Sequence, residues 1–220
     1  MGMTELQRCN CNFGRETLGF RKAGNTRIDG KSFDSMSRYP YSVVEAALGE
    51  LFRAKTESQR RTLRGRINHL QRLGVIDAAP GKGQALQYEQ NDIWRWVFCF
   101  ELAEYGVTPA VQAALVDTYW KTVLGGIFRS ALRAVETGKP DVFLYIRGPA
   151  LMSAAWNQEP HRFAGVPHIG KFTASDFGLV LEWLEKDERT PPRLSIVNLS
   201  ARLRMLNKAL ASTQELSERA

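Results

Sequence analysis

The residues best suited to chemistry lie in one short stretch, residues 56–76, which is rich in arginine and has no acid after Glu57. Apolar residues recur in it at helical spacing: Leu63, Ile67, Leu70 and Leu73. This period predicts an amphipathic helix with one side against a core and its polar donors facing outward. Guanidinium and amide groups donate hydrogen bonds to phosphates and base edges, so the stretch predicts contact with a polyanion.

The candidate contact residues are the exposed donors of this helix and two positions in the β-hairpin predicted after it. They are Ser58, Arg60, Arg61, Arg64, Arg66, Asn68, Gln71, Lys82 and Gln84. The alternative is a basic face that is only solvated, as on an ordinary surface helix. The segments on either side of the helix favour the first interpretation.

The elements around the arginine-rich helix predict a helix-turn-helix. Ser42 can cap a preceding helix whose apolar stripe runs to Phe52, and a short polar break follows. Gly74 can adopt the left-handed conformation that ends the arginine-rich helix. Val75–Ile76 and the alternating residues 84–88 then predict a β-hairpin, with its turn at 80–83. A hairpin placed after a recognition helix is a wing.

The rest of the chain predicts further helices and a small sheet. Asn91–Asp92 can cap a very apolar helix that ends near Gly106, and Thr108–Pro109 opens another that runs, with an interruption at Gly125–Gly126, to about residue 136. Residues 142–146 and 194–198 are predicted strands that can pair in one sheet. A helix from about 175 to 186 lies between them, and Ser200 can cap the last helix.

These elements predict an α+β fold. It would consist of an N-terminal winged helix-turn-helix, a helical linker and a small C-terminal α/β module. The expected parts are an irregular basic arm (1–38), the winged domain (39–106), a helical connector (107–139), a dimerisation or partner module (140–213) and a tail (214–220).

Charge and cysteine content limit the class of protein. Residues 1–90 carry fifteen Lys and Arg against nine Asp and Glu, an excess of +6, whereas residues 91–220 carry fifteen against fourteen. This asymmetry favours a nucleic-acid partner for the N-terminal part, and no long basic amphipathic helix supports a membrane surface. Three cysteines are too few for a disulfide framework and indicate a reducing cytoplasm. No apolar run or leader predicts a membrane location.

Motifs for catalysis or metal binding are not evident in the sequence. Cys9 and Cys11 lack a second Cys or His pair, and Gly81–Gly83 lacks the spacing of a phosphate loop. No nucleophile with a matching base is recognisable, so catalytic residues, metals and cofactors are not expected. The tryptophans, among them Trp94 and Trp96, could stack on bases, but their helical spacing favours a core role.

The order of motifs between Leu63 and about Val116 resembles the DNA-binding domain of the MerR family. The matching pieces are Thr62-Leu-Arg in the recognition helix, Leu73-Gly-Val-Ile76 at its end, Tyr88-Glu-Gln-Asn-Asp-Ile93 before the third helix, and the corner Leu102-Ala-Glu-Tyr-Gly-Val-Thr-Pro-Ala-Val111. The resemblance implies that Arg64 and its helical neighbours enter the major groove, while Lys82 and Gln84 of the wing hold the backbone. Gly65 stands where the family usually has an aromatic residue, and the long dimerisation helix of the family is not evident.

The function expected from the sequence is sequence-specific binding of double-stranded DNA by a bacterial or phage transcription regulator. Such a protein would be cytoplasmic, associated with the nucleoid and homodimeric, with RNA polymerase or another regulatory protein as a further candidate partner. One alternative is an excisionase-like or replication-initiation factor that also binds DNA. The other is an adaptor whose winged domain contacts protein, and an enzyme ranks third.

Overall fold

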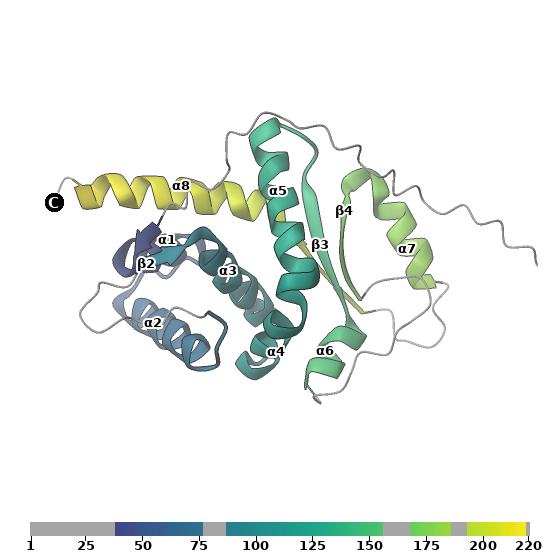
Figure 1. Ribbon diagram of the computed structural model, residues 1–220, viewed down its shortest axis with the longest axis horizontal. Coiled ribbons are helices and arrows are strands. Elements are labelled where there is room, and N and C mark those ends of the chain that lie inside the picture. Colours follow the sequence, from purple (N-terminus) through teal and green to yellow (C-terminus); the bar gives the residue numbers. More distant parts are fainter. Residues whose placement is uncertain (1–37, 77–86, 156–167, 186–192, 219–220) are drawn as a thin grey trace, which may run out of the picture. The chain divides into compact units, whose positions relative to one another are not determined.

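The computed structural model describes residues 38–76, 87–155, 168–185 and 193–218, all within one compact unit, Met36–Ala220 (Figure 1). The helices are α1 (Tyr41–Leu51), α2 (Glu57–Arg72), α3 (Gln90–Glu104), α4 (Pro109–Tyr119), α5 (Gly125–Thr137), α6 (Gly148–Ala155), α7 (Phe177–Glu185) and α8 (Leu199–Glu218). The strands are β1 (Arg38–Pro40), β2 (Gln87–Glu89), β3 (Val142–Arg147), β4 (Ile169–Thr173) and β5 (Leu194–Asn198). This mixture confirms the predicted α+β class.

Helix α2 forms where the arginine-rich period predicted it. Thr56 caps it: its side chain accepts the Gln59 backbone N–H at 3.2 Å, and the Gln59 side chain accepts the Thr56 N–H at 2.9 Å. This reciprocal pair satisfies two backbone donors that a helix start otherwise leaves without partners. Leu63, Ile67 and Leu70 are buried as predicted.

Two details at the ends of these helices differ from prediction. Leu73 was expected in the core but is 38% exposed, because it follows the last helical residue and Val75 is buried beside the end of the helix instead. Helix α1 begins at Tyr41, after extended Pro40, so Ser42 is not its cap. The chain before α1 is extended because it forms β1, and α1 begins directly after it, earlier than predicted.

The prediction of a hairpin after α2 is wrong for the residues that the structure describes. Val75–Ile76 form a bend, and β2 pairs antiparallel with β1, with Tyr39 opposite Tyr88. The physical reason is the burial of the Tyr88 ring, which lies 4.8 Å from the Trp96 ring and faces the core. Lys82 and Gln84, the candidate residues of the wing, lie outside the described residues.

Helices α3, α4 and α5 supply much of the core. Glu89, and not Asn91–Asp92, caps α3, and Asp92 accepts the Glu89 backbone N–H at 3.2 Å. The predicted interruption before α5 is a π-helical turn, η1 (Trp120–Leu124). A Cβ at Gly125 would meet the Trp120 carbonyl oxygen at 3.1 Å, a tight contact, so glycine fits this turn more easily than a residue with a side chain.

A three-stranded antiparallel sheet follows in the order β4-β3-β5, which confirms the predicted pairing of residues 142–146 with 194–198. Alternate β3 residues face opposite sides: Leu144 joins the main core, and Tyr145 packs with Phe172 and Val180. Helix α5 and α7 lie on opposite sides of this sheet (Figure 1). Strand β4 and helix α6 were not predicted from the sequence.

Helix α8 connects the sheet to α1. Asn198, not Ser200, caps it by accepting the Ala201 backbone N–H at 2.9 Å. Leu203 and Leu206 are fully buried where α8 packs on α1 and α5. The main core therefore runs without interruption from residues of the expected winged domain into residues of the expected C-terminal module.

Candidate nucleic-acid interface

The outward face of α2 carries a row of exposed residues opposite its buried apolar side chains. Its members are Arg61, Gly65, Asn68 and Arg72, which are all exposed. Their spacing of four, three and four residues places them in one row along the helix. Two guanidinium groups and one carboxamide are therefore presented together on a single convex surface.

Gly65 lies in the middle of this row, between Arg61 and Asn68. A Cβ built there would meet nothing within 4 Å, so internal packing does not require the glycine. Glycine inside a helix costs roughly 0.5 to 1 kcal/mol relative to alanine. Because Gly65 has no side chain, another molecule can approach the helix backbone closely between Arg61 and Asn68.

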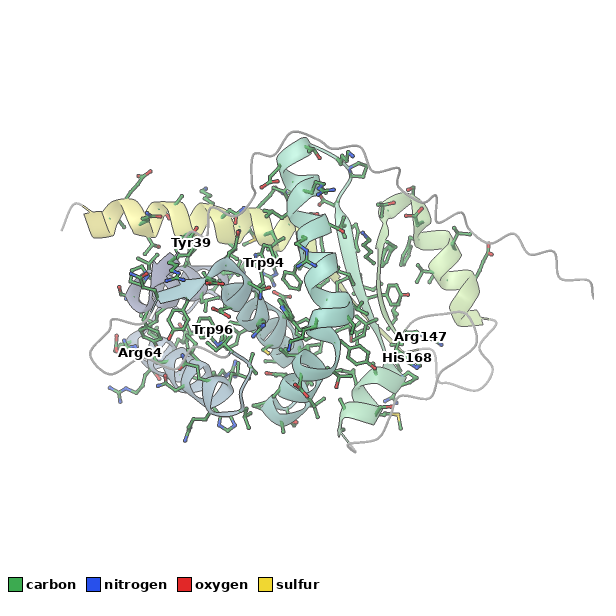
Figure 2. The ribbon with its side chains drawn as sticks, viewed as in Figure 1. Tyr39, Arg64, Trp94, Trp96, Arg147 and His168 are labelled. Atoms are coloured by element: carbon green, nitrogen blue, oxygen red, sulfur yellow. The ribbon has the colours of Figure 1, made fainter. Side chains whose placement is uncertain are left out.

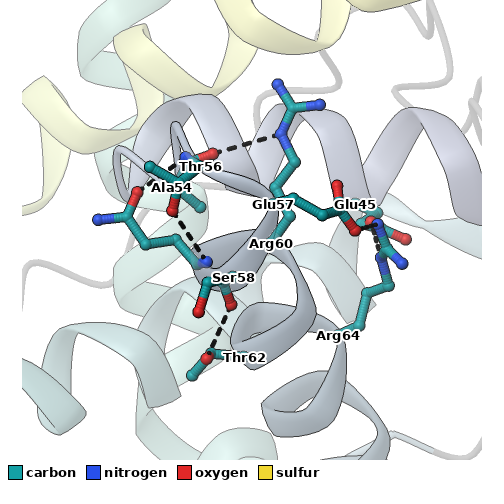
Figure 3. Close-up of polar contacts among 9 residues, drawn as sticks. Glu45, Ala54, Thr56, Glu57, Ser58, Arg60, Thr62 and Arg64 are labelled. Carbon is teal, nitrogen blue, oxygen red and sulfur yellow. Dashed lines mark hydrogen bonds and ion pairs between the residues drawn. The ribbon is translucent and has the colours of Figure 1, made fainter.

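The guanidinium of Arg64 is engaged within the protein. Its Nε donates to Glu45 Oε1 at 2.6 Å and its Nη2 to Glu57 Oε1 at 3.1 Å (Figure 3). The hydrogen bond and charge of Glu45 raise the pKa of Arg64. Arg64 thus joins α2 to α1, and the residue from which the sequence predicted most of the base contact is bound to two carboxylates.

Two other predicted contact residues lie on the same flank as Arg64. Gln71 is half-buried and donates from Nε2 to the hydroxyl of Tyr88 at 2.8 Å, which links α2 to β2. Arg60 is exposed, and its Nε donates to the Ala54 carbonyl at 3.4 Å (Figure 3). Gln71 therefore has a structural partner, whereas the charge of Arg60 remains at the surface.

The opposite flank of α2 holds Ser58 and Arg66. Both line a cleft of about 240 Å³ beside the turn before α2, together with Thr62, whose hydroxyl donates to the Ser58 carbonyl at 3.0 Å. The structure thus places Arg61 and Asn68 on the outward face, Ser58 and Arg66 on one flank, and Arg60, Arg64 and Gln71 on the other. Of the predicted contact residues that the structure describes, only Arg61 and Asn68 lie in the outward row.

Arg72 completes the row and was not among the predicted contact residues. It lies four residues after Asn68 and eleven after Arg61, so the helical period carried the signal for it. Within the described part of the chain, Arg61, Arg66 and Arg72 form no ion pair with a carboxylate. Glu57, the one acid in α2, is occupied by Arg64. Among the described residues, no carboxylate therefore pairs with the positive charges of Arg61 and Arg72 on the outward face.

The tryptophans of α3 serve the core. Trp94 stacks on Phe128 of α5 with 5.7 Å between ring centroids, and Trp96 packs on Tyr88. Figure 2 shows both rings within the packed interior, whereas Arg64 lies at the edge of the helical part. Neither indole is exposed as a platform for bases.

No group of three metal-ligating side chains is found among the described residues. Cys99 is fully buried, and burial raises the pKa of its thiol well above the usual range, so it has little thiolate character. Among the described helices, none combines the length and apolar character required to cross a bilayer.

Comparison with known proteins identifies no relative: no family model, no curated protein and no solved structure matches this chain.

Proposed function

We propose that this protein binds double-stranded DNA through the outward face of α2 and acts as a transcription regulator. The observation that carries the proposal is the row Arg61, Gly65, Asn68 and Arg72, which is exposed and has no acid among its members. A polyanion is the partner whose charge matches this face.

The side chains of the row match the chemistry of the major groove. Arginine can donate two hydrogen bonds to guanine O6 and N7. Asparagine can donate one hydrogen bond to adenine N7 and accept one from the adenine N6 amino group. The groove is wide enough for one α-helix, and Gly65 allows the helix to enter it deeply. Arg61, Asn68 and Arg72 are the proposed base-reading residues.

The flanks of α2 suit the two phosphate strands that border the groove. Arg66 and Ser58 lie on one side of the row and Arg60 on the other, so each strand would meet at least one cation. Contacts of this kind set the position of the helix and the salt dependence of binding, but carry little sequence information. Arg64 acts in this proposal as the brace that fixes α2 on α1.

The test is selection of binding sites from random duplex DNA with the wild-type protein and with the double variant Arg61→Ala/Arg72→Ala. The proposal expects a recurrent motif for the wild type, and its loss in the double variant with secondary structure retained. Arg133→Ala is the matched control, because Arg133 is an exposed helical arginine on α5. Absence of any salt-sensitive DNA binding by the wild type would overturn the proposal.

A role in protein contact is a second candidate, favoured by apolar side chains on α7. Phe177, Leu179 and Leu181 are 40%, 52% and 44% exposed. In a homodimeric regulator such a surface could join two copies, and the selected motif would then be two-fold symmetric. Sedimentation of the wild type beside Leu179→Glu tests this: a dimer that the substitution dissociates supports it, and a monomer in both counts against it.

A further inference from the structure

Three successive helices in this protein end in the same backbone motif. After α1, α2 and α3, one N–H bonds to the carbonyl five residues earlier: Ala54 to Gly49 at 2.8 Å, Val75 to Leu70 at 3.1 Å and Val107 to Leu102 at 3.1 Å. The N–H before each of these bonds to the carbonyl three residues back. This double closure is the Schellman motif, which needs one residue in the left-handed conformation.

The residue in that position is glycine in two of the three motifs and arginine in the third. Gly74 has a φ of 78° and Gly106 of 77°, whereas Arg53, after α1, has a φ of 56°. Among the described residues, Arg53 is the only non-glycine with a positive φ. A side chain disfavours this conformation sterically, so folding stability alone would favour glycine at position 53 as well.

Among the described residues, the side chain of Arg53 has no polar partner that would compensate for this conformation. The residue is exposed, and within the described residues it forms neither a hydrogen bond through its guanidinium nor an ion pair. It lies where two grooves beside α2 meet. One is the 240 Å³ cleft lined by Ser58, Arg66 and Glu104. The other, of about 530 Å³, is lined by Lys55 and Arg60 and also by Glu45 and Glu50.

We infer that Arg53 is a phosphate-contacting residue of the turn between α1 and α2, and that this contact keeps an arginine where the backbone favours glycine. The inference rests on the proposed function, since the phosphate is that of the duplex held by α2. Arg53 adds a cation at the junction of the two flanks, beyond the helix itself. Residues held in such sparsely populated conformations cluster at functional sites, including those that hold ligands.

The experiment compares the wild-type full chain with Arg53→Gly, Arg53→Lys and the control Arg133→Ala. Thermal unfolding is measured for each, together with affinity for duplex DNA over a series of salt concentrations. Arg53→Gly relieves the backbone, so its unfolding midpoint is expected to rise by roughly 1 to 4 °C. Its affinity is expected to fall up to about fivefold, with a salt slope smaller by about 0.9, the value for one lost phosphate contact.

The other variants separate charge from backbone. Arg53→Lys keeps the charge and the strain, so its salt slope and midpoint should remain those of the wild type, and Arg133→Ala should not change the slope. An Arg53→Gly protein with wild-type affinity and slope would overturn the inference while leaving the proposed function standing. A lower midpoint for Arg53→Gly would also overturn it, because the side chain would then be retained for packing. A wild-type protein that does not bind duplex DNA would overturn both.

Discussion

Arg64 and Glu45 are nineteen residues apart in sequence, yet Arg64 Nε lies 2.6 Å from Glu45 Oε1. The pair joins α1 and α2, and Glu57 binds the other end of the same guanidinium. The helical period alone placed Arg64 near the polar face of α2 and made it the leading candidate for base contact. In the folded protein, Glu45 on α1 binds the guanidinium of Arg64 instead.

Replacing Arg64 with alanine should therefore affect folding more than sequence preference. The substitution leaves Glu45, whose side chain is only 20% exposed, without its cation. We expect a small loss of stability in urea unfolding, because the arginine itself is well solvated, and an unchanged motif in binding-site selection. A motif that changes at one position in the Arg64→Ala selection would restore Arg64 as a base-reading residue.

Gly65→Ala should change stability and binding in opposite directions. Alanine at an exposed helical position with no neighbour within 4 Å should raise the free energy of unfolding by about 0.5 to 1 kcal/mol. The added methyl group would stand on the face that we propose enters the groove, so DNA affinity should fall. Urea titration and equilibrium binding of one preparation measure both. A variant that is more stable and binds equally well would show that Gly65 does not face the duplex.

Leu206→Ala should show that α8 belongs to the same core as α1 and α2. The side chain of Leu206 is fully buried, and truncation of such a leucine costs about 2 to 5 kcal/mol. The neighbouring Met205 is 45% exposed, so Met205→Ala is the matched control and should be nearly neutral. Circular dichroism during urea unfolding measures both variants. Similar midpoints for the two would contradict the packing of α8 described above.

Glu101 should make stability depend on pH. Its side chain is 9% exposed and is paired with Arg202 at 2.6 Å. Burial raises the pKa of Glu101 above its usual value of 4.5, and the charge and hydrogen bond of Arg202 oppose this shift. A raised pKa in the folded state means that this group's contribution to stability is complete below about pH 4.5 and is lost as the pH rises through the folded pKa.

The comparison that tests this dependence is wild type against Glu101→Gln, by urea unfolding at several pH values from 4 to 7. The stability of the wild type relative to the variant should be highest at the acid end and decline toward neutrality, by roughly 1.4 kcal/mol for each unit of pKa difference. A relative stability that instead grows with pH would mean that the ion pair with Arg202 outweighs burial.

Local patterns in the sequence identified much of the fold. The spacing of Leu63, Ile67 and Leu70 predicted α2, and the apolar run at 142–146 predicted β3 and its pairing with β5. Such patterns are reliable because helical and strand periods reflect which side of one element is buried. The helical period identified the arginine-rich face of α2, and it also places Arg72 on that face.

Tertiary structure decided which of these side chains remain available to contact another molecule. The partners of Arg64, Gln71 and β2 lie on other elements, at Glu45, Tyr88 and β1, and no local period encodes those distances. The left-handed conformation of Arg53 also depends on how α1 ends and α2 begins. Sequence by itself therefore determined the elements and the charged face of α2. Only the packing of distant segments decided which arginines are held by carboxylates and which face solvent, because an ion pair forms only where folding brings its two members together.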